Sequence, residues 1–235
     1  GDPQHWKAPL LLFKLQKAVE IYIPQLPHLF QNGVEDFAQL IGLGDQVAEG
    51  DEVRVNNKEE RSERVYYLYN KPLHVVSSNP HEYEESIEDV IDIPGVYPVG
   101  RLDKDSTGLI ILTNDGRVTK QLLDPDNGFE KEYEVTVHEK IQSNFKKTME
   151  GGVDIGDYMT KPTEIDVLDE NRFRIILTEG KTRQIRKMCN ALRYTITSLT
   201  RIRVANIRLG KLKEGQHQQL KGKRLQDFLE TLGLI

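Results

Sequence analysis

The strongest restriction on the fold comes from a short apolar run that follows a glycine and ends in a turn signal. Residues 109–113 read Leu-Ile-Ile-Leu-Thr, directly after Gly108, and Asn-Asp-Gly follows at 114–116. An apolar run of this length, closed by such a turn, predicts a buried strand and not an exiting helix. We therefore expect this segment to lie inside a sheet.

The stretch around that run, GRLDKDSTGLIILTNDG at 100–116, also matches most of a calcium-loop pattern, with Asp103 and Asp105 at its first and third positions. A calcium loop of this kind needs a bidentate Glu at position twelve and a helix on each side. Asn114 stands at that position, and a strand is expected where the second helix would begin. The metal interpretation therefore fails. Each aspartate is then either a turn residue that binds nearby backbone N–H groups or a catalytic carboxylate.

Hydrophobic patterning predicts the remaining elements. Strands are expected at 65–69, 109–113, 133–137, 172–177 and 194–198, and helices at 117–123, 142–149, 182–192 and 225–232. The strands do not alternate strictly with helices, and the strand at 133 alternates apolar and polar residues. We therefore expect an α+β domain with a mixed, largely antiparallel sheet.

The chain divides into two expected domains. The charged stretch NKEERSER at 57–64 has almost no apolar residue and is the expected linker. Before it, turn signals between valines predict a tight hairpin at 43–58. We therefore expect a small N-terminal domain over 1–60 and a larger one over 65–235.

Composition indicates a soluble globular protein in a reducing compartment. Of 235 residues, 37% are hydrophobic and 29% are charged. No apolar run approaches the roughly 18 to 20 residues that a membrane span needs, and no secretory signal is recognised. The chain opens with Gly1 and not Met, which indicates a trimmed chain or a fragment. A lone cysteine and widely spaced histidines suggest neither a disulfide nor a metal site. We expect a cytoplasmic protein without a membrane partner, metal or cofactor.

Charge is distributed unevenly along the chain. The net charge is −5, but the segment 171–213 holds twelve Lys or Arg and a single acid, Glu179, so its local charge is +11. Because screening keeps electrostatic attraction local, within about 10 Å at ordinary salt, such a segment can bind a polyanion. The alternative is a solvated basic surface with no partner.

Two further stretches carry candidate functional residues. In EKEYEVTVH at 130–138, Tyr133 shares a strand face with Val135 and Val137, so it is either a core anchor or a phenol at the rim of a cleft on which a base can stack. In EGKTRQIRKMCNALRY at 179–194, Thr182 is the expected N-cap of a helix whose apolar stripe faces the core. Arg183, Arg186 and Lys187 lie off that stripe, and they either solubilise the helix or bind an anion.

Together, these three stretches resemble the motifs of the Rsu/Rlu-type ribosomal RNA pseudouridine synthases, in order and in spacing, from about residue 66 to the end. The stretches DNGFEKEYEVTV and RQIRKMCNALRY resemble the branch that acts on the 23S RNA of the large subunit. The resemblance implies an isomerase without a cofactor, which breaks the N1–C1′ bond of a uridine, turns the base and rejoins it through C5. It also implies that LGDQVAEGDEVRVNN at 43–57 is the hairpin half of a degenerate S4-like RNA-binding domain.

The resemblance also implies roles for individual residues. Asp103 matches the catalytic aspartate, as nucleophile or base, and Asp105 is expected to organise the turn. Arg101 matches the arginine that holds the extruded nucleotide. Tyr133 matches the tyrosine that stacks on the flipped uracil and is a candidate to take the C5 proton, and Arg186 matches the basic residue paired with the aspartate. Arg183 and Lys187 are the expected RNA-binding residues beside them. We expect a monomer that acts on ribosomal RNA, with transfer RNA as the alternative substrate.

Two rival functions come from other classes of protein. A non-catalytic RNA- or ribosome-binding module would use the basic segment and leave the Asp103 loop inert. A glycoside hydrolase would need a second carboxylate across a cleft from Asp103, and no motif supplies one.

Overall fold

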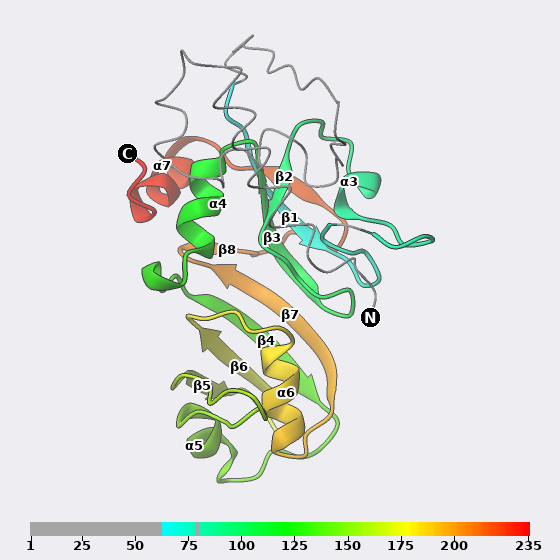
Figure 1. The fold of residues 1–235 in the computed structure, drawn as a ribbon, viewed down its shortest axis with the longest axis vertical. Coiled ribbons are helices and arrows are strands. Elements are labelled where there is room, and N and C mark those ends of the chain that lie inside the picture. The colour runs from blue at the N-terminus through cyan, green and yellow to red at the C-terminus, as the bar shows by residue number, and fades with distance from the viewer. Residues whose placement is uncertain (1–62, 79) are drawn as a thin grey trace, which may run out of the picture. The chain divides into compact units, whose positions relative to one another are not determined.

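The computed structural model describes residues 63–78 and 80–235. The small domain expected over 1–60 and its S4-like hairpin lie outside these residues. The part that is described contains one sheet of nine strands in the order β5-β6-β4-β7-β3-β1-β9, with β2 beside β3 and β8 beside β7 (Figure 1). The strands are β1 (Tyr66–Lys71), β2 (Tyr97–Val99), β3 (Thr107–Thr113), β4 (Lys131–Val137), β5 (Glu164–Val167), β6 (Arg172–Leu177), β7 (Ile196–Val204), β8 (Ile207–Arg208) and β9 (His217–Gln219).

The sheet is mixed and largely antiparallel, as expected. Only β3 and β7, among the described strand pairs, run parallel. Gly108 lies opposite Arg201 at this junction. Its φ is +108°, and a Cβ on it would lie 2.3 Å from the carbonyl oxygen of Arg201. Only glycine lets the two backbones approach this closely.

The expected buried strand is β3. Its residues from Gly108 to Thr113 are all buried. Leu109 and Ile111 face one core cluster, and Ile110 and Leu112 face another on the opposite side of the sheet. Burial on both faces explains why the run is continuously apolar instead of alternating.

The helices divide between two ends of the sheet (Figure 1). Residues of α4 and α7 pack with β1 and β3 in one core cluster, whereas residues of α5 and α6 pack with β4 and β6 in another. Cys189 in α6 is fully buried in the second cluster. The helical elements are α3 (Ile87–Val90), α4 (Gly116–Leu123), η3 (Pro125–Asn127), α5 (Phe145–Glu150), α6 (Gln184–Ala191) and α7 (Gly222–Thr231).

The end of β7 differs from its expected position. A strand was expected at 194–198, but β7 runs from Ile196 to Val204. The charged residues at 201 and 203 did not indicate a strand in the sequence. In the structure Arg201 is buried and bonds to backbone carbonyls, and Arg203 is partly buried in ion pairs. The short strands β2, β5, β8 and β9 were not expected either, because so few residues carry little periodicity.

In the described residues, no helix is both long and apolar enough to cross a membrane.

Candidate active site

Hydrogen bonds from residues 74–77, the chain segment after β1, hold the loop that carries Asp103. Ser77 Oγ donates to the carbonyl oxygen of Leu102 at 2.9 Å and accepts from its N–H at 2.9 Å. The N–H of His74 donates to the carbonyl oxygen of Lys104 at 2.9 Å. The N–H of Ser106 closes the turn on the carbonyl oxygen of Asp103 at 3.0 Å. These contacts fix where the two aspartates lie relative to β3.

The N-terminal turn of α6 meets this loop through Asp105. Arg183 Nη2 and Nη1 lie 2.8 and 3.1 Å from the two carboxylate oxygens, a bidentate pair. Arg186 Nη2 donates to the backbone carbonyl of Asp105 at 2.6 Å and to Ser106 Oγ at 3.3 Å. Partial burial raises the pKa of the Asp105 carboxyl, but the hydrogen bond from Arg183 and the charge of Arg186 outweigh it and hold the pKa below its usual value.

Asp103 lies beside this pair and is less tightly held. Its Oδ2 is 4.0 Å from Arg183 Nη1, and its side chain is 34% exposed. The expected contact from Arg186 goes to Asp105 in this structure, because the guanidinium reaches across the turn to residues 105 and 106. The structure thus brings Asp103, Arg183 and Arg186 together, but the closest ion pairs of both arginines are with the neighbouring Asp105.

Tyr133 reaches the same region from the start of β4. It lies opposite Arg201 in β7, and Arg201 in turn lies opposite Gly108 in β3. The Tyr133 side chain is partly buried and packs against the core cluster that includes Ile185 of α6. Tyr133 therefore faces the same side of the sheet as the helix that carries Arg186.

Two buried cations, Arg201 and Lys71, and a partly buried one, Lys131, lie next to this site, and none of them was expected. Arg201 is 4% exposed, and its Nε donates to the carbonyl oxygen of Leu109 at 2.7 Å. Lys71 is fully buried, and its Nζ donates to the carbonyl oxygens of Pro72 and Val75 at 2.8 and 2.7 Å.

Burial lowers the pKa of Lys71 to about 8, against the opposing pull of Asp103 and Asp105. Burial and the charge of Arg201 also lower the pKa of Lys131. Positively charged side chains, Lys71, Lys131 and Arg201, therefore lie next to the site. The sequence offered one sign that Lys71 is unusual, its position at the end of a strand and just before a proline, but the same pattern is typical of an ordinary turn.

The remaining expected residues lie at the margins. Arg101 is exposed, and its backbone carbonyl is 3.4 Å from Arg201 Nη1. Lys187 Nζ lies 3.8 Å from Asp157. The expected N-cap, Thr182, was wrong: the cap is Arg183, with a left-handed φ of 55° and no side-chain cap hydrogen bond. Arg183 adopts this conformation where its side chain turns onto the Asp105 loop.

The basic segment 171–213 does not form one surface, which corrects the simpler picture of a continuous basic patch. Arg174 pairs with Glu134 at 3.3 Å, and Arg203 pairs with Glu132 at 2.7 Å. Both glutamates alternate with Tyr133 along β4, so they project from the opposite face of the sheet. A bulge at Ile202, where the pairing shifts between Glu132 and Tyr133, turns Arg201 and Arg203 to different faces.

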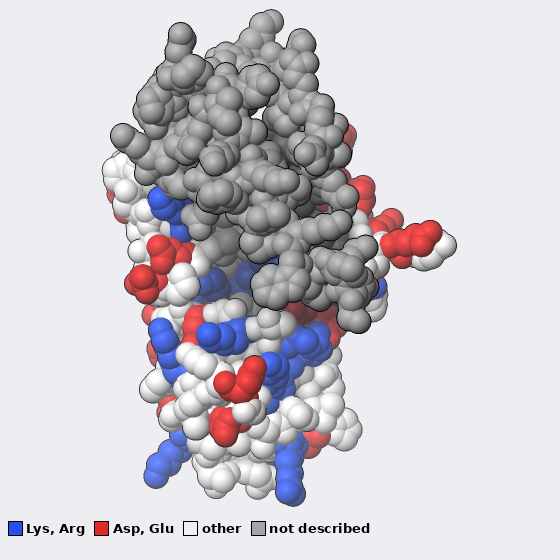
Figure 2. All heavy atoms as spheres, in the orientation of Figure 1, with Lys and Arg blue, Asp and Glu red and all other residues white. Residues whose placement is uncertain are grey.

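Positive charge that can meet a polyanion is therefore concentrated around the N-terminal half of α6. Lys and Arg side chains gather across the middle of the face drawn in Figure 2. Lys181 lies 4.2 Å over the ring of Tyr158, and Arg183, Arg186 and Lys187 follow it along the chain.

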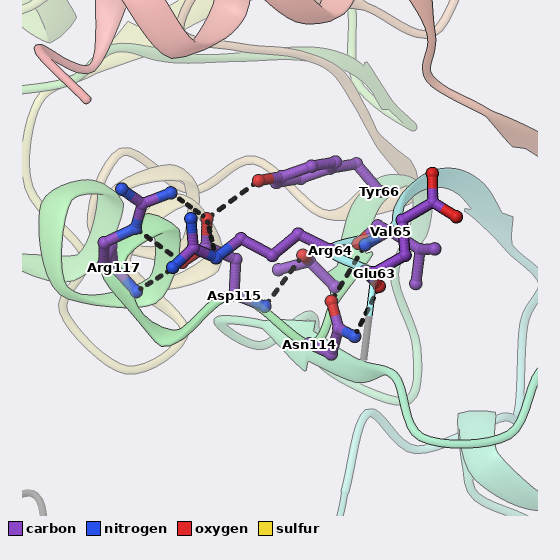
Figure 3. Close-up of polar contacts among 8 residues, drawn as sticks. Glu63, Arg64, Val65, Tyr66, Asn114, Asp115 and Arg117 are labelled. Atoms are coloured by element: carbon purple, nitrogen blue, oxygen red, sulfur yellow. Dashed lines mark hydrogen bonds and ion pairs between the residues drawn. The ribbon is translucent and has the colours of Figure 1, made fainter. Parts of the chain in front are cut away.

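A second polar cluster, around Asp115, lies at the other end of β3 and has a structural role (Figure 3). Arg117 binds the buried carboxylate of Asp115 through Nε and Nη2 at 2.9 and 2.8 Å, and Tyr66 donates its hydroxyl at 2.8 Å. Burial and the bond to Asp115 raise the pKa of Tyr66 to about 12. The cluster joins the start of β1 to the start of α4, far along β3 from Asp103.

The arrangement around Asp103 combines a partly exposed carboxylate, an aromatic ring and several cations. The cations around it attract a polyanion. An aromatic ring at the start of a strand offers a stacking surface for a base. Across residues 63–78 and 80–235, no group of three or more His, Cys, Asp or Glu side chains could hold a metal ion.

A loop aspartate, a strand tyrosine and a basic helix on a mixed sheet define an RNA-modifying enzyme of the pseudouridine synthase type. The family model described as RNA pseudouridylate synthase matches residues 65–191, and the chain belongs to this family. It is therefore an RNA pseudouridine synthase, an isomerase.

Several known proteins are similar to the chain. The dual-specificity RNA pseudouridine synthase RluF of Salmonella typhi is 37% identical over 195 residues, which cover 81% of this chain and 68% of that protein. The ribosomal small subunit pseudouridine synthase A of Haemophilus influenzae is 28% identical, over 70% of this chain and 74% of its own length. A crystal structure of a pseudouridylate synthase superposes with a TM-score of 0.66 at 30% identity, over 72% of this chain and 74% of the other.

Proposed function

We propose that this chain converts a specific uridine of ribosomal RNA to pseudouridine, and that the RNA is the 23S RNA of the large subunit. The observation that carries the proposal is the convergence of the Asp103 loop, the start of β4 and the N-terminal turn of α6 on one site. Similarity to enzymes named for RNA or ribosomal substrates supports RNA as the substrate class. The resemblance of residues 126–137 and 183–194 to the large-subunit branch supports the choice of 23S RNA.

In the proposed reaction, the target uridine leaves its stack and enters the site between Asp103 and Tyr133. Unstacking a base costs a few kcal/mol. Stacking on Tyr133 returns part of this, about 1 to 3 kcal/mol. Arg101, exposed next to the loop, holds the extruded nucleotide, and Arg183 and Lys187 bind the RNA backbone around it.

Asp103 then carries the chemistry, as a nucleophile or a base at the ribose or the uracil. The N1–C1′ bond breaks, the base turns, and a C5–C1′ bond forms. The proton displaced from C5 goes to solvent, and N1 gains a proton, so the product is an isomer of the substrate. We also propose that the chain acts as a monomer, because Asp103, Tyr133 and Arg186 all come from the same chain. We propose that it acts in the cytoplasm.

The test is tritium release. RNA labelled at uridine C5 should lose label to water in the presence of the protein, because the new bond forms at C5. Separate 23S, 16S and transfer RNA transcripts distinguish the substrates, and we expect release from 23S RNA. Added chelator should leave the rate unchanged. Failure of all three RNAs to release label would refute the enzymatic proposal and favour a module that only binds RNA.

The matched variants assign the reaction to one carboxylate. Asp103→Asn should abolish release with the fold intact, and Asp105→Asn should cost far less. Asp169→Asn is the control, since Asp169 also pairs with an arginine, Arg172, but at the opposite end of β6 from α6. An active Asp103→Asn with a dead Asp105→Asn would exchange the roles of the two aspartates.

A further inference from the structure

The arginine best placed to bind RNA already holds an anion. Arg183 makes its bidentate pair with Asp105, and both side chains are accessible, 47% and 45% exposed. The backbone of Arg183 is left-handed, with a φ of 55°. A non-glycine residue in this region carries local strain, which persists only where the surroundings hold it. Two contacts hold Arg183 here: its side chain pairs with Asp105, and its carbonyl oxygen accepts from the N–H of Lys187 at 2.9 Å.

A carboxylate and a phosphate are alternative partners for the same guanidinium. Both offer two oxygens to the planar fork of donors, with similar geometry. Asp105 also leaves part of this donor set unused. Arg186 Nε is buried without a hydrogen bond, although Asp105 Oδ2 lies 3.3 Å away. A correctly aligned oxygen at this position would satisfy a donor that Asp105 does not.

We propose that Arg183 and Arg186 form a subsite for a phosphate of the substrate RNA, and that Asp105 occupies it as a placeholder until the RNA displaces it. This inference rests on the proposed function, because it takes RNA as the ligand. The placeholder occupies the two arginines in the free enzyme. RNA that places a phosphate here gains two cationic partners at once and releases the Asp105 carboxylate to solvent.

The loop also has contacts with α6 that do not use the Asp105 carboxylate. The shortest contact of Arg186 goes to the backbone carbonyl of residue 105, and a further contact goes to Ser106. Neither contact uses the side chain of Asp105. Asp105→Asn should therefore fold, keep Arg186 in place and leave Arg183 free.

The experiment measures binding of a short fluorescein-labelled oligouridine by anisotropy. Breaking an exposed ion pair costs about 0.2 to 1 kcal/mol, so Asp105→Asn should bind about 1.4- to fivefold more tightly than the wild type. Asp169→Asn removes the same charge from a different arginine pair and should bind like the wild type. In the Arg183→Gln background, Asp105→Asn should give a smaller gain, because one of the two arginines that it frees is gone.

Each outcome decides the question. Equal or weaker binding by Asp105→Asn would overturn the placeholder, and so would a gain that is as large without Arg183 as with it. Thermal unfolding checks the fold, and Asp105→Ser replaces Asp105→Asn if the latter melts early. If the wild type releases tritium but Asp105→Asn binds oligouridine no more tightly, the placeholder proposal is refuted and the proposed function stands. A wild type that binds oligouridine without releasing tritium from any RNA refutes the proposed function and leaves the binding comparison readable.

Discussion

Tyr133 presents a ring and a hydroxyl to the same site, and substitution can separate the two. Its ring packs partly into the core cluster beneath α6, which fixes its orientation. The hydroxyl is the end that a reacting base would meet. The two parts correspond to two proposed roles, stacking on the uracil and removal of the C5 proton.

We predict that Tyr133→Phe folds and binds RNA normally, because the stacking surface is kept, whereas Tyr133→Leu loses about 1 to 3 kcal/mol of binding. Single-turnover tritium release then distinguishes the roles. A severe loss of rate in Tyr133→Phe indicates proton transfer by the hydroxyl, and a normal rate leaves stacking as the role. Tyr67→Phe, on β1, controls for the loss of a tyrosine hydroxyl elsewhere. Unchanged binding by Tyr133→Leu would contradict the stacking proposal.

Single residues also mark the limit of prediction from sequence. Asp103, Tyr133 and Arg186 lie in contiguous motifs, so their patterns are visible without a structure. Arg201 is different, because its burial depends on the pairing of β7 with β3 and β4, which are distant in sequence. Its backbone acceptor, Leu109, is 92 positions away. No local pattern predicts that an arginine inside a strand is buried.

At the scale of elements, β3 organises the site because its first residues carry the loop and its body is buried on both faces. The apolar run predicted this strand from sequence alone. Its parallel neighbour could not be predicted, because β7 pairs with it only through a short segment at Gly108. The bulge in β7 was equally hidden, since it arises from a shift in pairing between two strands and not from a turn residue.

We predict that Gly108→Ala destabilises the fold by roughly 2 to 6 kcal/mol, the sum of backbone strain and overpacking. The added Cβ would lie 2.3 Å from a backbone oxygen, which cannot move without separating β3 from β7. Gly95→Ala is the matched control. Gly95 also has a positive φ, +73°, but no atom within 4 Å of the added Cβ. It should therefore cost only the backbone term, roughly 1 to 2 kcal/mol.

Urea unfolding followed by circular dichroism measures both changes. Equal losses in the two variants would show that close approach of the strands contributes nothing at Gly108.

On the scale of the whole molecule, the sheet separates two kinds of positive charge. Arginines on one face, such as Arg174 and Arg203, are neutralised by glutamates of β4 and its preceding loop. Those around α6 meet Asp103 and Asp105 of the loop before β3. Sequence alone predicted the excess of charge in 171–213 but not its division, because the division follows from strand alternation and the bulge.

We predict that RNA binding weakens steeply with salt despite the net charge of −5. Each phosphate contact contributes about −0.7 to −0.9 to the slope of log K against log salt. Arg183→Ala should flatten this slope by just under one unit, and Arg174→Ala, on the opposite face, should leave it unchanged. Titrations at several salt concentrations provide the slopes. If Arg174→Ala flattened the slope as much as Arg183→Ala, RNA would have to contact both faces of the sheet.

The burial of Cys189 has a practical consequence for covalent labelling. It is the single cysteine of the sequence, and burial raises the pKa of its thiol to about 12. Maleimides react with the thiolate, so the folded chain is nearly inert toward them at neutral pH. A cysteine introduced on an exposed loop can therefore carry a dye or spin probe selectively, with Cys189 left in place and the core around α6 intact.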